Sequence, residues 1–244
     1  MFDFGLIVML VFIILFSFIA FKVVKQVLKL TFLITILTIV VLGLFSYLVY
    51  QDMGDLKENF SFNDNLLILQ NENQLLTGVK LNFEKISDFE ELEAFNSLSQ
   101  DQINEYNPYY TNEEYDKILG DHYKILFIDY NTFQDIQEIE VLNKAYSNEF
   151  VLQVLESQNP MELLTPKSLN IKSSENIKPI LFTMLLTEKI KLQKSTFLIT
   201  EMKNKNIRVY PETITFKIIK YIPVDFMQDQ LAKISEKVKQ EEEQ

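Results

Sequence analysis

Two long uncharged apolar runs near the N-terminus constrain this chain more than any other feature. Phe4–Phe21 is 18 residues without a charge, and Leu30–Tyr50 is 21. At about 1.5 Å of rise per helical residue, the runs would be roughly 27 and 31 Å long, against a hydrocarbon core of about 30 Å. We therefore predict that residues 1–50 form a membrane anchor, with spans at about 4–21 and 30–50. A cleaved signal peptide fits poorly, because Met1-Phe2-Asp3 has no basic residue and no small-residue cleavage site follows.

Three lysines separate the runs and set the expected sidedness. Lys22, Lys25 and Lys29 have the spacing i, i+3 and i+7, so a helix would place them on one face. The positive-inside rule puts them in the cytoplasm, and everything from residue 51 onward is then extracytoplasmic.

Two arrangements of the anchor fit this sidedness. One is a pair of spans, and the other is a single span at 30–50 with the first run on the membrane surface. We favour the pair, because 18 apolar residues insert readily. However, no Gly, Pro or Asn lies between Leu6 and Leu42 to make the turn that a pair needs.

The composition of the rest of the chain excludes several functions. Asp3 and the three lysines are the only charges in the anchor, so residues 51–244 hold 33 acidic and 20 basic residues. This acidity disfavours nucleic acid as a partner. The chain has no cysteine and one histidine, His122, which excludes disulfides, thiol catalysis and a multi-histidine metal site. The sequence contains no glycine-rich phosphate loop, and we assign no catalytic, metal-binding or cofactor-binding residue.

Beyond the anchor we predict one soluble α+β domain built from antiparallel hairpins and covering helices. A stalk at 51–64, in which residues 52–60 could instead continue the anchor helix, leads to the domain at 65–223. An amphipathic helix follows at 224–244. The first hairpin joins apolar stretches at 66–69 and 75–83 through the polar Asn71–Gln74, with Gly78 as a candidate bulge. The remaining expected elements are a helix that opens at 87–92, a buried strand at 123–129, helices at 133–157 and 180–192, a second hairpin at 196–201 and 206–210, and a strand at 214–218.

Two places in the domain are candidates for function. Residues 104–115 contain four tyrosines, which suit a carbohydrate- or peptide-binding surface, although an ordinary packed loop is the simpler interpretation. Asp129 ends the buried strand, where catalytic carboxylates occur in α/β sheets, and Asp121 is a second nearby carboxylate. A strand-terminal aspartate that begins a turn is the commoner arrangement.

The layout of the chain resembles uncharacterised small membrane-anchored proteins of archaea. The resemblance lies in the apolar N-terminal pair, LKENF at 56–60, the hairpin LLILQNENQLLTGVKL at 66–81 and VYPETITFKIIKYIP at 209–223. It implies a membrane protein and no particular activity or site.

These observations predict a membrane-anchored protein with a non-catalytic extracytoplasmic binding or scaffolding domain. Its partners would be the lipid bilayer, through residues 4–50, and another envelope protein or a second copy of itself. One alternative is a cell-envelope hydrolase that uses carboxylates. The other is a small oligomeric membrane transport component, which the lack of ionisable residues in both runs disfavours.

Overall fold

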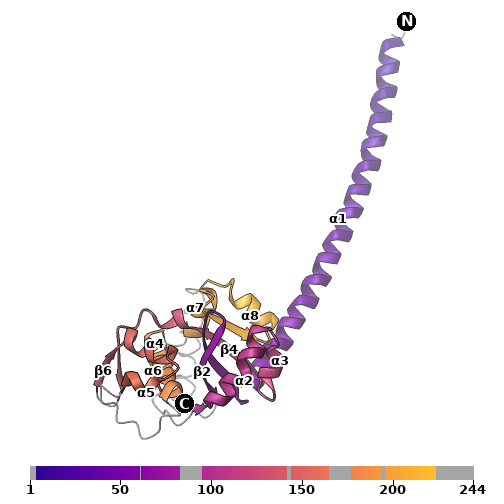
Figure 1. The fold of residues 1–244 in the computed structure, drawn as a ribbon. Coiled ribbons are helices and arrows are strands. Elements are labelled where there is room, and N and C mark those ends of the chain that lie inside the picture. Colours follow the sequence, from indigo (N-terminus) through magenta and orange to yellow (C-terminus); the bar gives the residue numbers. More distant parts are fainter. Residues whose placement is uncertain are drawn as a thin grey trace, which may run out of the picture. The chain divides into compact units, whose positions relative to one another are not determined.

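The computed structural model describes residues 4–60, 62–82, 95–141, 144–164, 177–193 and 196–223. The chain divides into two compact units, residues 1–51 and residues 52–244. Several helices and strands of the second unit are labelled in Figure 1. The helix expected to open at 87–92 and the amphipathic helix expected at 224–244 lie outside the described residues.

The N-terminal helix α1 runs without interruption from Phe4 to Asn59. It is long and apolar enough to cross a membrane, and nearly all side chains between Leu15 and Tyr50 are exposed. The structure does not show the helix pair that we favoured, because α1 continues through the three lysines. Every residue there is compatible with a helix, and the hydroxyls of Thr31, Thr35 and Thr38 bond to the carbonyl four residues back.

The residues expected to form a stalk begin the second unit and are largely helical. Residues 52–59 are the last two turns of α1. Leu56 and Phe60 pack against the larger hydrophobic core of the domain, and the ring centroid of Phe60 lies 6.2 Å from that of Phe216. This segment is therefore part of the folded domain.

The domain is α+β and is built on a five-stranded mixed sheet in the order β3-β2-β1-β4-β7. Strands β1 (Asn65–Asn71) and β2 (Gln74–Leu81) form the predicted antiparallel hairpin, and β4 (Ile125–Asp129) is the predicted buried strand. The sequence did not indicate that β1 and β4 are parallel neighbours. The short β3 (Phe95–Ser97) and β7 (Ile207–Tyr210) form the edges, each antiparallel to its neighbour.

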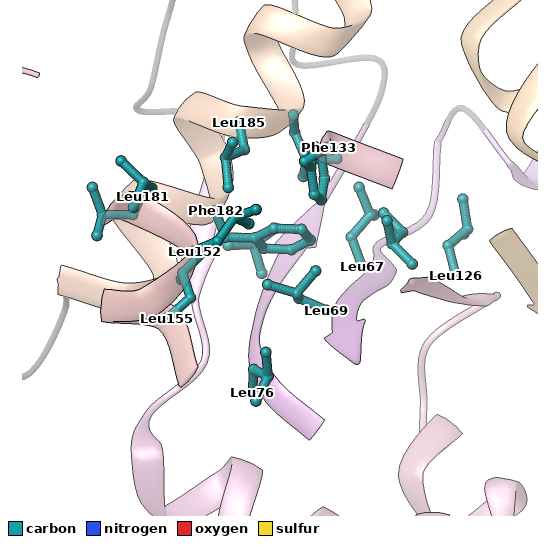
Figure 2. Close-up of a cluster of buried hydrophobic side chains, with 14 of the residues drawn as sticks. Leu67, Leu69, Leu76, Leu126, Phe133, Leu152, Leu155, Leu181, Phe182 and Leu185 are labelled. Atoms are coloured by element: carbon teal, nitrogen blue, oxygen red, sulfur yellow. The ribbon is translucent and has the colours of Figure 1, made fainter. Parts of the chain in front are cut away.

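Helices cover both faces of the sheet, because alternate strand residues point to opposite sides. On one face Leu66, Ile68 and Phe127 pack with residues of α2 (Gln100–Thr111) and α3 (Tyr115–Leu119). On the other, Leu67, Leu69 and Leu126 pack with residues of α4 (Asn148–Glu156) and α6 (Ile177–Gln193). Figure 2 shows this second cluster, where side chains of both helices approach Phe133 and Leu69.

The prediction of a helix over 133–157 is wrong for most of that segment. The segment contains the end of a 3₁₀ turn (Tyr130–Phe133), the hairpin β5 (Glu138–Val141) and β6 (Lys144–Ser147), and only then α4. Ile139 and Tyr146, which a helix would place on one face, are direct cross-strand partners. A seven-residue spacing is close to two helical turns, so paired residues of a hairpin can imitate helical periodicity.

The second hairpin and the following strand are also corrected. Residues 196–201 belong mostly to helix α7 (Phe197–Lys203), and the expected strand at 214–218 is helix α8 (Ile214–Ile219). Local β-branched residues favoured strands, but packing of Phe197, Met202 and Phe216 into the core decided otherwise. The predicted helix at 180–192 is confirmed as α6, and a single turn, α5 (Pro160–Leu164), precedes it.

Gly78 does not form the bulge we expected. The register of the first hairpin shifts between Leu69 and Gln70, opposite Leu76. Gly78 is instead a point of close approach, because a Cβ built there would lie 2.7 Å from Leu98 Cδ1 and 3.1 Å from the Leu67 carbonyl oxygen.

Candidate functional site

A polar cluster lies where the parallel strands β1 and β4 both end. Gln70 and Asp129 are register partners at these carboxyl ends, and Gln70 Nε2 donates a hydrogen bond to Asp129 Oδ2 at 3.4 Å. The antiparallel neighbour β7 contributes Arg208, which pairs with Phe127 of β4. Crevices at the carboxyl ends of parallel strands are common ligand sites in α/β sheets.

Arg208 is the centre of this cluster and is the only arginine among the 23 basic residues of the chain. One guanidinium nitrogen donates to Gln70 Oε1 at 3.0 Å and to the Tyr110 hydroxyl at 2.9 Å. The guanidinium carbon lies 5.6 to 5.9 Å from the ring centroids of Tyr110, Tyr115 and Phe127. A planar guanidinium combines ring stacking with directed hydrogen bonds, which a lysine ammonium does not.

The groups around Arg208 are fixed by their own contacts. The Tyr110 hydroxyl also donates to Gln70 Oε1, and burial raises the pKa of the Tyr110 phenol, although the Arg208 charge opposes this. Tyr110 is therefore a neutral hydrogen-bond donor near neutral pH. Asp129 Oδ1 accepts hydrogen bonds from the Asn131 backbone at 2.9 Å and its side chain at 2.7 Å, so this aspartate caps the turn after β4.

The tyrosine-rich segment forms helix rather than loop. Ser99 caps α2 in a capping box with Gln102, and Tyr110 near the end of the helix is buried while Tyr109 is half-buried. Next to them, Tyr115 packs edge-on against Tyr210, whose hydroxyl donates to Asp116 Oδ1 at 2.7 Å. We call Tyr109, Tyr115, Tyr210 and Arg208 the tyrosine–arginine surface, since all four side chains are at least partly exposed.

The two aspartates considered for catalysis are not brought together. Asp121 is exposed and precedes β4, whereas Asp129 ends it, so the strand separates them by about 13 Å or more. Paired carboxylates of glycosidases lie roughly 5 to 9.5 Å apart. His122 Nδ1 lies 2.9 Å from the Leu119 carbonyl oxygen, which gives this histidine a local structural contact.

Sequence reasoning missed the role of Arg208. We did not single out Arg208 in the sequence, where it lies among lysines between residues 189 and 220. Composition offered the one signal that could have found this residue, because Arg208 is the single arginine of a chain whose other basic residues are lysines. Arginine and lysine are not interchangeable where a side chain must stack on rings and form directed hydrogen bonds. Within the described ranges, no group of three or more His, Asp or Glu side chains is arranged to hold a metal ion.

Comparison with known proteins does not place this chain in a family. No protein-family model, curated protein or solved structure matches it.

Proposed function

We propose that this chain is a membrane-anchored protein whose folded domain is a non-catalytic binding or scaffolding module on the extracytoplasmic side. The observation that carries the proposal is the tyrosine–arginine surface. Tyrosine and arginine are enriched among residues that dominate protein–protein binding energy. Here they are held rigidly by ring packing and hydrogen bonds, which reduces the entropy lost on association. The proposed partner is another envelope protein or a second copy.

The proposed sidedness rests on Lys22, Lys25 and Lys29, which the positive-inside rule places in the cytoplasm. The two apolar runs at 4–21 and 30–50, each about as long as the hydrocarbon core is thick, support two spans. A helix of 56 residues would be about 84 Å long, far more than the roughly 30 Å of the hydrocarbon core. If only 30–50 crossed, the 18 apolar residues of 4–21 would lie outside the hydrocarbon. We therefore propose that the chain turns near the lysines in a bilayer.

Single-cysteine labelling tests this topology cleanly, because the chain has no native cysteine. Asp3→Cys, Gln26→Cys and Gln51→Cys variants would be treated in intact cells with a membrane-impermeant maleimide. We expect labelling at positions 3 and 51 and protection at 26. Protection at position 3 with labelling at position 51 would mean that the chain spans the membrane once. Labelling at position 26 with protection at position 51 would refute the proposed sidedness.

In-cell crosslinking tests the binding role. A photocrosslinking residue at Tyr109 is expected to yield a defined crosslinked species, whereas the same residue at the exposed Glu140 of β5 serves as the matched control. Equal capture at both positions, or none at Tyr109 in correctly folded protein, would contradict the proposal. Among the described residues, no contact favours the hydrolase or transport alternatives.

A further inference from the structure

Helix α8 carries an amphipathic stripe on its outer side. The spacing i, i+3, i+4 and i+7 places four residues on one side of the helix and of the turn that follows it: Ile214, Lys217, Ile218 and Tyr221. The backbone nitrogen of Tyr221 donates to the Ile218 carbonyl oxygen at 2.8 Å, so the chain keeps a helical path through that turn. Tyr221 is 87% exposed, Lys217 is exposed and both isoleucines are half-buried. We call these four residues the α8 stripe.

The opposite side of α8 is the one that the domain buries. Phe216 is 6% exposed and belongs to the larger hydrophobic core, and Thr215 beside it is also buried. Successive helical residues are about 100° apart around the axis, so Ile218 points roughly 200° away from Phe216. Neither hydrophobic core of the described residues includes an isoleucine of the α8 stripe. Packing of the domain therefore explains Phe216 but not the apolar side chains on the outer side.

A hydrogen bond holds the start of α8 beside Asp52, which follows the membrane anchor directly in the chain. Asp52 Oδ2 lies 2.6 Å from the Thr215 backbone nitrogen. Asp52 is only two residues beyond Tyr50, where the second apolar run ends, so their Cα atoms are at most about 7 Å apart. If residues 30–50 cross the bilayer, Tyr50 lies at the edge of the hydrocarbon core, and a headgroup layer of roughly 5 to 7 Å follows. Covalent connectivity then keeps the start of α8 close to the headgroups.

We propose that the α8 stripe rests on the bilayer surface, as a second membrane contact outside residues 4–50. Tyrosine is enriched at membrane–water interfaces, because its ring is apolar and its hydroxyl is polar. The Lys217 ammonium can reach lipid phosphates while its methylene groups stay beside the isoleucines. Such a combination of apolar and basic side chains is typical of interfacial helices. The inference rests on the membrane anchoring that we propose above.

The covalent link to the anchor is what favours lipid over a protein as the occupant of the α8 stripe. A helix of six residues buries little apolar area, so its own affinity for a bilayer is low. The anchor compensates for this, since a surface tethered within a few residues of the membrane meets the lipid at a high effective concentration. A free protein partner has no comparable advantage.

Tryptophan fluorescence tests the contact, because the chain has no native tryptophan and Tyr221→Trp supplies a single reporter. The full chain would be reconstituted in phosphatidylcholine vesicles with and without brominated acyl chains, which quench tryptophan on contact. We expect blue-shifted emission that the brominated lipid quenches. Glu140→Trp is the matched control, since the β5–β6 hairpin lies on the opposite side of the domain from α8 (Figure 1). Its emission should resemble that of tryptophan in water and stay unquenched. Equal quenching at both positions would overturn the proposal.

A reporter in the anchor separates failure of this contact from failure of the anchor itself. Tyr47→Trp lies within the second apolar run and should be quenched whenever that run is in the bilayer. Quenching at Tyr47 without quenching at Tyr221 would refute the surface contact alone. Quenching at neither position would refute the anchor and the contact together. Blue-shifted but unquenched emission at Tyr221 would mean that protein, such as a second copy, covers the stripe, and would also overturn the proposal.

A charge placed in the α8 stripe should weaken the contact. In the Tyr221→Trp background, Ile218→Glu should remove most of the quenching, because a carboxylate does not enter the apolar part of the interface. Leu192→Glu is the matched control, since Leu192 is an exposed apolar residue of α6 outside the stripe, and it should leave the quenching unchanged. Equal quenching in both variants would contradict a role for the stripe.

Discussion

Asp52 caps helix α8 from 163 positions away in the chain, since its Oδ2 accepts a hydrogen bond from the Thr215 backbone nitrogen at 2.6 Å. Helix α8 has no capping hydrogen bond from its own N-cap side chain, Thr213. One turn further along α1, Asp55 Oδ2 accepts a hydrogen bond from the Tyr123 hydroxyl at 2.6 Å. The residues that follow the second apolar run therefore bind both α8 and the segment just before β4.

We predict that Asp52→Asn destabilises the folded domain by about 1 kcal/mol at neutral pH, as expected for loss of a charged cap. Burial raises the pKa of the Asp52 carboxyl, but the hydrogen bonds from Thr215 and the Lys124 charge lower it by more, so its pKa is below the usual value. The ionised Asp52 carboxylate therefore makes its full contribution to the free energy of unfolding above the pKa of an unfolded aspartate, about 3.9. It is lost as the pH falls through the lower folded pKa.

Urea denaturation of the full chain in detergent, followed from pH 7 to pH 3, checks this prediction. The difference in the free energy of unfolding between wild type and Asp52→Asn should become smaller as the pH approaches 3. Asp121→Asn is the matched control, because Asp121 is exposed and should have little effect at any pH. If this difference in the free energy of unfolding grew as the pH fell, the predicted direction of the pH dependence would be refuted.

The buried ion pair of Lys189 and Glu201 should respond unequally to removal of each partner. Glu201 is 2% exposed and lies 3.3 Å from Lys189 Nζ, which also contacts both Asp135 oxygens at 2.7 Å. Lys189→Met leaves Glu201 buried without a cation and should cost about 3 to 5 kcal/mol. Glu201→Gln should cost less, because Lys189 keeps Asp135.

A double-mutant cycle measured by urea denaturation tests this asymmetry. The double variant Lys189→Met with Glu201→Gln should be more stable than the sum of the single effects implies, because no charge is then left buried alone. Equal costs for the two single variants would contradict the assigned geometry.

Gly78 should not tolerate a side chain. Gly78→Ala places a methyl group against Leu98 Cδ1 and the Leu67 backbone carbonyl, so we expect destabilisation of about 1 to 3 kcal/mol. Leu98→Val in the same chain should recover part of the loss, since it relieves one of the two close contacts. Gly54→Ala is the control, because a Cβ there meets nothing within 4 Å and alanine favours the helix. The midpoint of thermal unfolding should fall for Gly78→Ala and rise for Gly54→Ala.

Arg208→Lys should destabilise the domain although it keeps the charge. The ammonium cannot reproduce the stacking over Phe127 and Tyr115 together with both hydrogen bonds to Gln70 and Tyr110. We expect a loss of about 1 to 2 kcal/mol by urea denaturation. The reciprocal Lys217→Arg at an exposed site should have an effect within about 0.5 kcal/mol. An unchanged midpoint for Arg208→Lys would mean that the guanidinium geometry is unimportant.

The sequence by itself determined the features that depend on neighbouring residues. The apolar helix, the hairpin of β1 and β2, strand β4 and helix α6 follow from continuous apolar runs, a polar turn and a proline in the first helical turn. In each case the local pattern and the final environment favour the same conformation.

Only the tertiary structure decided the parallel pairing of β1 with β4, the β5–β6 hairpin, helices α7 and α8, and the cluster around Arg208. Gln70 and Arg208 are 138 positions apart, and Asp52 and Thr215 are 163 apart. Such contacts depend on which side chains the two faces of the sheet bury. They also depend on which backbone N–H groups at helix ends find a hydrogen-bond acceptor elsewhere in the chain. Local periodicity carries no information about either, so a short apolar segment adopts the conformation that long-range packing stabilises.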